Sequence, residues 1–212
     1  MVLKIHGAPT SPNTKRVTML CKEFALDYEL VELSFWTEDQ KKPEFVEKYS
    51  PLAQVPVLDD DGFVLYESRA IAFYLAAKAR SPLLPSEDDV KRRARYEQAV
   101  QTEVCHVDHL AYSLAWEKIW KAYTGLTTDE ERVKEYARTL EETFDAYDKI
   151  LSKQKYLAGD ELTLADLFHL PHGNLFPQCG YTWLEDGKRP NLYRWWKELN
   201  ARPSWQAVKD HA

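Results

Sequence analysis

The first candidate for chemistry is a hydroxyl at the start of a predicted helix, in the stretch GAPTSPNTKRV at positions 7–17. Pro12 suits the first helical position, which makes Ser11 the predicted N-cap. A hydroxyl can accept a backbone N–H and still donate its own proton. Ser11 could therefore cap the helix and also donate a hydrogen bond to a ligand atom, with Thr10 and Thr14 as the neighbouring hydroxyls that could assist or replace it.

A second candidate is the segment QVPV at positions 54–57. A proline at the start of a strand donates no ladder hydrogen bond, so the structural interpretation is a strand entry or a turn. If the Val55 to Pro56 bond is cis, the backbone N–H and C=O of Val55 point outward beside Gln54. They could then pair with an extended peptide ligand.

Charged and hydroxyl residues could hold the two ends of such a peptide. Ser68 is the predicted N-cap of a helix, and a helix N-terminus also binds carboxylates. Glu67 beside it could take an ammonium, so the pair suits an α-amino-acid head group. Gln40 and Lys41 are by composition part of a solvated loop, but they could hold a second carboxylate.

The elements that must position these residues alternate in type over the first 80 or so positions. The order is βαβ followed by αββα, and the turn DDDG at 59–62 joins the last two strands as a hairpin. This predicts a mixed four-stranded sheet of the thioredoxin-like plan. The predicted strands are 2–6, 28–33, 55–58 and 63–66, and the predicted helices are 12–24, 43–48 and 68 to about 79.

The stretch SPLLPSEDD at 81–89 is the predicted linker, because it carries two prolines and an acidic run. Everything after it is predicted to be helical. We therefore expect an α/β domain over 1–82 and an all-α domain over 89–212. The predicted helices of the second domain are 90–123, 128–152, a helix opened by a capping box at Thr163 to Asp166, an aromatic helix after Pro190 and a short last helix after Pro203.

The overall charge and the apolar runs exclude several classes of protein. The net charge is −6 and no basic block is present, which argues against a nucleic-acid partner. No segment approaches about 18 uninterrupted apolar residues and no secretory leader is seen, so we expect no membrane span and a cytoplasmic protein. Three widely spaced cysteines without a C-x-x-C motif support neither a disulfide framework nor a dithiol centre.

Two groups of residues have the content of a metal site. Cys105, His106, Asp108 and His109 lie together, and His169 with His172 repeats a helical spacing. Neither group has a convincing third and fourth ligand. We therefore expect histidines that are satisfied by neighbours or face solvent, and no metal.

Seven segments together carry a resemblance to a known family. They are GAPTSPNTKRV, DQKKPEF, QVPVL, YESRAIAFYLA, GLTTDEER, YLAGDELTLADL and RPNLYRWWKELNARPSWQAV, and they cover nearly the whole chain. In this order they resemble a glutathione transferase of the phi-like, serine-type class. The resemblance implies a thioredoxin-like domain that binds glutathione, a helical domain that contributes the site of a hydrophobic electrophile, and a homodimer. No metal or redox cofactor is required.

The resemblance also implies roles for single residues. Ser11 is the catalytic serine; it would donate a hydrogen bond that favours the thiolate of glutathione. The glutathione contacts are Gln40, Lys41, Gln54, Val55, Pro56, Glu67 and Ser68. The acceptor pocket is assigned to Trp116 and Trp120, for which helix packing in the core is the structural alternative. Apart from the resemblance, we expect Pro12, Phe35 and Trp36 to line the other wall of this pocket.

Two departures from the family pattern and one rival function complete the expectations. The chain has Ser50-Pro51-Leu52-Ala53 where the family commonly has Asn-Pro-Phe-Gly, which could change the dimer contact, and Pro12 could alter access to the sulfur. The expected activity is conjugation, with glutathione-dependent reduction of hydroperoxides as an additional reaction. The alternative is a non-catalytic carrier of hydrophobic ligands or a scaffold module with the same fold.

Overall fold

The described chain forms two compact units. The structure is a computed structural model that describes residues 2–212. One unit contains the chain up to Leu84 together with Ala201–Ala212, and the other contains Pro85–Asn200. The sequence does not predict the return of the last twelve residues to the first unit. The assignment of one binding role to each domain stays a prediction.

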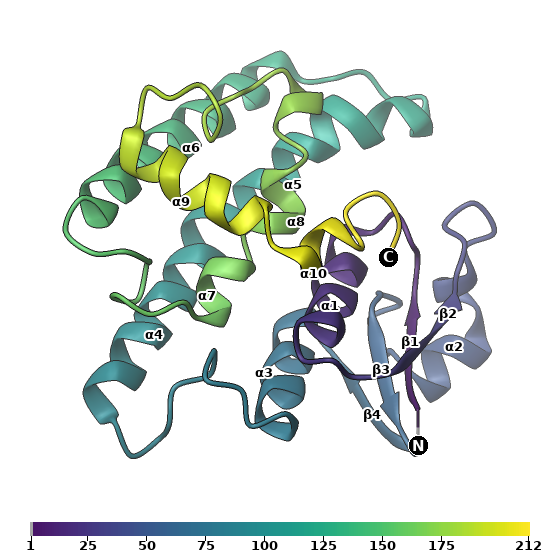
Figure 1. The fold of residues 1–212 in the computed structure, drawn as a ribbon. Helices are drawn as coiled ribbons and strands as arrows, with labels where there is room; N and C mark the ends of the chain where they lie inside the picture. The colour runs from purple at the N-terminus through teal and green to yellow at the C-terminus, as the bar shows by residue number, and fades with distance from the viewer. Residues whose placement is uncertain (1) are drawn as a thin grey trace. The chain divides into compact units, whose positions relative to one another are not determined.

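The first unit is built on a mixed four-stranded sheet in the order β2-β1-β3-β4 (Figure 1). The strands are β1 (Leu3–Gly7), β2 (Tyr28–Glu32), β3 (Val57–Asp60) and β4 (Phe63–Tyr66). β1 pairs with β2 in parallel, and the pairs β1–β3 and β3–β4 are antiparallel. The predicted topology is confirmed. The third strand begins at Val57, so that Val55 and Pro56 precede the paired part of the strand.

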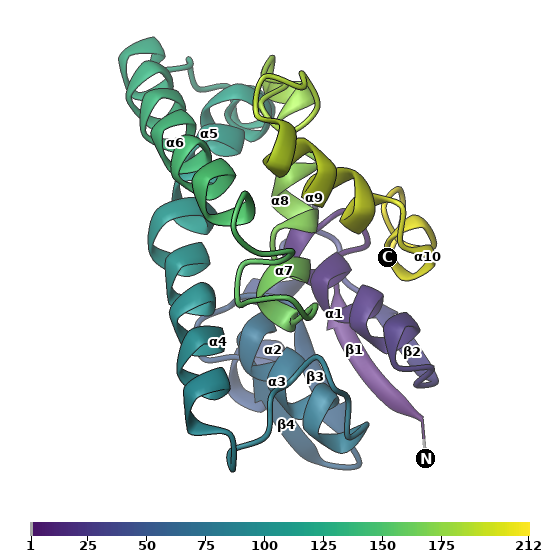
Figure 2. The same ribbon diagram turned by 60° about the vertical axis from the view of Figure 1, so that its left-hand side comes forward.

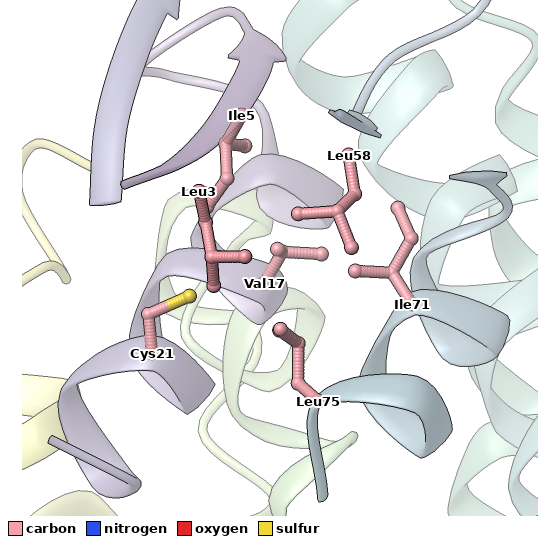
Figure 3. Close-up of a cluster of buried hydrophobic side chains, with 7 residues drawn as sticks. All are labelled: Leu3, Ile5, Val17, Cys21, Leu58, Ile71 and Leu75. Carbon is pink, nitrogen blue, oxygen red and sulfur yellow. The ribbon is translucent and has the colours of Figure 1, made fainter. Parts of the chain in front are cut away.

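Alternation along β1 determines which helices cover each face of the sheet, since successive strand residues point to opposite sides. Leu3 and Ile5 are buried against α1 (Pro12–Glu23) and α3 (Ser68–Lys78). His6 points to the other face, where its ring lies against Phe45 of α2 (Pro43–Lys48) and against Tyr49. Figure 3 shows the core of the first face, formed by Leu3, Ile5, Val17, Cys21, Leu58, Ile71 and Leu75.

The β3–β4 hairpin has the turn chemistry that its sequence predicts. Asp61 and Gly62 both have positive φ, at 57° and 90°. The Gly62 N–H donates to the Asp59 side chain over 2.8 Å. A two-residue turn of this kind matches the twist of the two strands, so the hairpin is specified locally.

The C-terminal segment packs on α1 of the first unit (Figures 1 and 2). α10 (Pro203–Gln206) follows Arg202, whose guanidinium pairs with Glu23 at the end of α1. The Lys15 ammonium donates to the Lys209 carbonyl over 2.7 Å. These contacts tie the last residues of the chain to both ends of the helix that Ser11 caps.

The second unit begins with a long helical stretch that contains two π-helical turns and ends in a 3₁₀ turn. It runs through α4 (Val90–Glu103), η2 (Val104–Asp108), α5 (His109–Ala115), η3 (Trp116–Trp120) and η4 (Lys121–Thr124), and Gly125 ends it with a φ of 74°. η2 and η3 are π-helical turns, and the junction residues keep helical dihedrals. The helix predicted over 90–123 is therefore present, but the π turns are not predicted by its sequence.

The remaining helices of the second unit include the predicted capping box. Thr163 and Asp166 exchange hydrogen bonds at the start of α7 (Leu164–Leu167). The other elements are α6 (Glu130–Leu151), α8 (Leu170–Gly173), η5 (Pro177–Cys179) and α9 (Pro190–Asn200). Within residues 2–212 no helix is long and apolar enough to cross a membrane.

Candidate functional site

Ser11 is the N-cap of α1, as predicted. Its Oγ accepts the Thr14 N–H over 3.3 Å, and its side chain is almost entirely buried. A Cβ on Gly7 would lie 2.5 Å from the Thr14 Oγ1, so only glycine at the end of β1 lets the first turn of α1 approach this closely. The serine oxygen is thus occupied as an acceptor while its proton can be donated to another atom.

The segment after α2 carries the predicted cis-proline. The Val55–Pro56 peptide bond is cis, and Pro56 is buried. Gln54 is exposed, and its backbone N–H donates to the Ser50 Oγ over 3.3 Å. The cis bond that the functional interpretation assumes is present, while the pairing of the Val55 backbone with a peptide ligand stays a prediction.

The start of α3 differs from the prediction. Glu67, not Ser68, is the N-cap, and Glu67 has a φ of 69°. Ser68 is the first residue of the helix and is buried, so the prediction that it caps α3 is wrong. The Glu67 side chain is exposed beside it.

The hydroxyl of Ser68 has a different partner, which the sequence interpretation missed. Arg16 of α1 donates from Nη1 to the Ser68 Oγ over 2.8 Å, and its side chain is fully buried. Arg16 also donates to Asn13. The available signal was an arginine four residues before Leu20 on the apolar side of α1, where a charged residue needs a specific partner.

Gln40 and Lys41 lie in η1 (Asp39–Lys41), which precedes α2. Gln40 is buried and its Oε1 has no hydrogen-bond partner, whereas Lys41 is exposed and paired with Glu38. Asp39 fixes the turn by accepting the Lys42 ammonium and the Ser34 N–H, which lower the pKa of its carboxyl to about 2. The two predicted residues thus differ, because Gln40 is buried and Lys41 is exposed to solvent.

The residues predicted for the acceptor pocket are divided between the two units. Phe35 and Trp36 follow β2 and are exposed, and the exposed fraction of Trp36 is 81%. Trp116 and Trp120 bound the π turn η3 and are partly buried. Pro12 is the first residue of α1 and is partly buried. Their common role stays a prediction.

A neighbour of Trp120 was not singled out from the sequence. Its ring centroid lies 5.3 Å from that of Tyr112, whose side chain is partly exposed. The rings of Tyr112 and His172 also meet, edge to face. Tyr112 is eight positions before Trp120, more than two helical turns away, so the direct ring contact was not predicted from the sequence.

Two of the thiols, together with His169 and His172, lie in buried surroundings, whereas Cys105, His106 and His109 are exposed. Burial raises the pKa of the Cys21 thiol to about 12 and that of Cys179 to about 11, so neither is a nucleophile near neutral pH. His169 contacts the Tyr147 hydroxyl and the Ala165 carbonyl through its two ring nitrogens. His172 contacts Asp108 over 2.9 Å. Across residues 2–212 no group of three or more potential metal ligands is found.

Two family models match almost the entire chain. The N-terminal domain model of glutathione S-transferases matches residues 1–77, and the C-terminal domain model matches 94–203. The chain belongs to the glutathione S-transferase family. The resemblance seen in its sequence is confirmed, and the similarity extends to plant phi-class members of the family.

Individual relatives agree with this assignment over nearly full length. A glutathione S-transferase of Arabidopsis thaliana is 43% identical over 92% of this chain and 90% of its own. A glutathione S-transferase of Hypomyces subiculosus is 42% identical over 97% of this chain and 96% of its own. The structure of maize glutathione S-transferase I in complex with an atrazine glutathione conjugate has a TM-score of 0.88, with 32% identity over 99% and 97% of the two chains. The thioredoxin-like and all-helical parts of this glutathione S-transferase are thereby confirmed, while the roles of its single residues stay predictions.

Proposed function

We propose that this protein joins the thiolate of glutathione to the electrophilic carbon of small hydrophobic compounds. Family membership supports the reaction class, and a glutathione conjugate is bound to the similar maize enzyme. In the reaction the sulfur forms a bond to carbon, the leaving group departs with the bonding electron pair, and the thiol proton passes to solvent. The same thiolate can attack an oxygen of an organic hydroperoxide: the O–O bond breaks, the alcohol leaves after taking up a proton, and a second glutathione converts the resulting sulfenic acid to glutathione disulfide and water. This extends the proposal to peroxidase activity.

The observation that carries the proposal is the placement of the Ser11 hydroxyl. A free thiol has a pKa of about 8.5, so only a few per cent is ionised at neutral pH. The Ser11 oxygen already accepts the Thr14 N–H, which leaves its proton for a sulfur acceptor at the N-terminus of α1. Both the hydroxyl and the helix N-terminus favour an anion. Lowering the thiol pKa by about two units corresponds to roughly 2.7 kcal/mol.

The other residues of the first unit would bind the rest of the tripeptide. We assign the cysteinyl backbone of glutathione to Val55, which precedes the paired part of β3, with Gln54 and Pro56 beside it. Glu67 and Ser68 would hold the γ-glutamyl head group, and Gln40 with Lys41 would hold the glycyl carboxylate. The extended peptide would thus meet a cation at one end and a helix N-terminus at the other.

Three further proposals concern the assembly and its surroundings. We expect no metal or redox cofactor, because the thiolate supplies the nucleophile. We propose a homodimer, in which the exposed Leu52 replaces the aromatic residue common in the family and gives a smaller contact. We propose a cytoplasmic location, where glutathione keeps thiols reduced.

A panel of electrophiles and organic hydroperoxides assayed with glutathione tests the activity. The expected result is turnover of a chloronitrobenzene acceptor that saturates in both substrates. Turnover with hydroperoxides alone would restrict the enzyme to the peroxidase reaction. No turnover with any acceptor, together with binding of hydrophobic dyes, would contradict the transferase proposal and favour a carrier.

A further inference from the structure

Arg16 is a cation inside the first unit, on the helix that Ser11 caps. Its guanidinium is fully buried. One nitrogen, Nη1, donates both to the Asn13 Oδ1 and to the Ser68 Oγ, the latter over 2.8 Å. A single side chain therefore links the first turn of α1 to the first residue of α3, and it reaches Ser68 from a position 52 residues earlier in the chain.

This contact determines what the Ser68 hydroxyl can do. A guanidinium has only donors, so the serine oxygen must be the acceptor. The serine proton is then turned away from Arg16 and is available to another acceptor. Hydrogen bonds in such a chain strengthen one another, and the proton of a hydroxyl that accepts from a cation is a better donor.

The acceptor that suits this proton is an anion. Ser68 lies at the N-terminus of the 11-residue helix α3, where the positive end of the helix dipole also favours negative charge. The cation behind the hydroxyl adds to the same preference. The neutral alternative, an amide oxygen, accepts a hydrogen bond but gains much less from the cation.

We propose that Arg16 is a positioning residue for the α-carboxylate of the γ-glutamyl group, acting through Ser68. Asn13 holds the guanidinium, the guanidinium orients the Ser68 hydroxyl, and the hydroxyl donates to the carboxylate. This inference rests on the proposed function, because it requires glutathione as the ligand. The alternative is that Arg16 only ties α1 to α3 and supports every ligand equally.

Two ligands separate these possibilities in a calorimetric titration. One is S-hexylglutathione, and the other is the same compound with the γ-glutamyl α-carboxylate converted to an amide. The wild-type protein is expected to prefer the acid. In Arg16→Lys a compact ammonium replaces the planar fork, and the ratio of the two dissociation constants should shrink about tenfold, the size expected for a hydrogen bond that involves charge. Equal weakening of both ligands would overturn the proposal.

A second variant keeps the test decisive if Arg16→Lys does not fold. Asn13 is only partly buried, so Asn13→Ala should fold and should reduce the same ratio by about threefold. A ratio identical to wild type in Asn13→Ala would count against the chain of contacts. Lys22→Met, which removes a cation from the last turn of the same helix, is the matched control and should leave the ratio unchanged.

Failure of the proposed transferase function can be distinguished from failure of the role proposed for Arg16. If wild-type protein bound neither ligand and conjugated no electrophile, the transferase proposal itself would fail. If the wild type bound and conjugated normally but the Arg16→Lys penalty were the same for acid and amide, only the role of Arg16 would fail.

Discussion

The backbone N–H of Thr14 donates to the Oγ of Ser11 over 3.3 Å, and this one contact joins the stability of α1 to the chemistry proposed for the site. A substitution of Ser11 therefore has two effects that must be measured separately. Loss of the cap affects folding, whereas loss of the hydroxyl proton affects the sulfur.

Ser11→Ala and Ser11→Gly should reduce turnover to the same extent but reduce stability by different amounts. Both remove the hydroxyl, so both should raise the apparent pKa of the bound thiol and reduce turnover about ten- to hundredfold near neutral pH. Alanine at an N-cap costs about 1 kcal/mol and glycine only a few tenths. Rate–pH profiles and urea unfolding of both variants check this. A normal thiol pKa in both would exclude Ser11 and direct attention to Thr10 and Thr14.

At the exposed pair Lys41–Glu38, one substitution is expected to strengthen glutathione binding rather than weaken it. Glu38 competes for the ammonium that we assign to the glycyl carboxylate. Glu38→Gln should lower the KM for glutathione by up to about fivefold at low salt, because an exposed pair is worth about 1 kcal/mol or less. Lys41→Gln should raise the KM, and added salt should reduce both effects. An unchanged KM in both variants would remove Lys41 from the glutathione site.

The parts of the fold that depend on neighbouring residues were predictable from the sequence. The hairpin turn at Gly62 and the capping box of Thr163 and Asp166 each depend on residues within one turn, and both have the predicted form. The mixed sheet, with a parallel βαβ unit and an antiparallel hairpin, followed from the same local patterns together with the rules for connecting strands. The segment resemblance supplied the roles that the patterns alone left open.

Contacts between distant residues were not predictable in this way. Ser68 has the residue type of an N-cap, but its oxygen accepts a hydrogen bond from Arg16, 52 positions away. Glu67 is the N-cap instead and has a positive φ. The π turn that contains Trp116 is a second case, since residues 116–120 include no proline or glycine that would indicate a change of helical winding. The contact between Arg16 and Ser68 is a tertiary one, which the residue type of Ser68 does not reveal.

The buried ring of His6 predicts a loss of stability in acid. Burial lowers its pKa below the ordinary 6.5, with Lys48 and Lys4 adding to the shift and Asp59 and Glu29 opposing it. The unfolded chain then binds the proton more readily than the folded one. The stabilising contribution is fully present above pH 6.5 and is lost as the pH falls through the range between 6.5 and the folded pKa.

His6→Phe tests this contribution, because phenylalanine keeps a ring against Tyr49 and does not titrate. Urea unfolding from about pH 7.5 to about pH 5 should show a smaller decline in the free energy of unfolding for the variant than for wild type. His211→Gln, at an exposed histidine of the same unit, is the control and should follow the wild-type curve. Parallel curves for His6→Phe and wild type would show that His6 has a normal pKa in the folded protein.

Among the substitutions considered, replacement of the buried Asp166 is expected to cause the largest loss of stability. It accepts four hydrogen bonds, from the Leu157 and Thr163 N–H groups, the Thr163 hydroxyl and the Trp195 Nε1, at 2.9 to 3.0 Å. Asp166→Asn replaces one acceptor oxygen by a donor, which leaves at least one of these buried donors without a partner. The expected cost is about 2–4 kcal/mol in the free energy of unfolding.

Denaturant unfolding of Asp166→Asn measures that cost, and Glu161→Gln supplies the comparison. Glu161 lies just before the capping box and pairs with Arg92 at the surface, so its substitution should change stability by less than about 0.5 kcal/mol. The proposed glutathione contacts all lie in the other unit, so folded Asp166→Asn protein should retain the wild-type KM for glutathione. A large change in that KM at a temperature where the variant is fully folded would show that the network acts on the site as well as on stability.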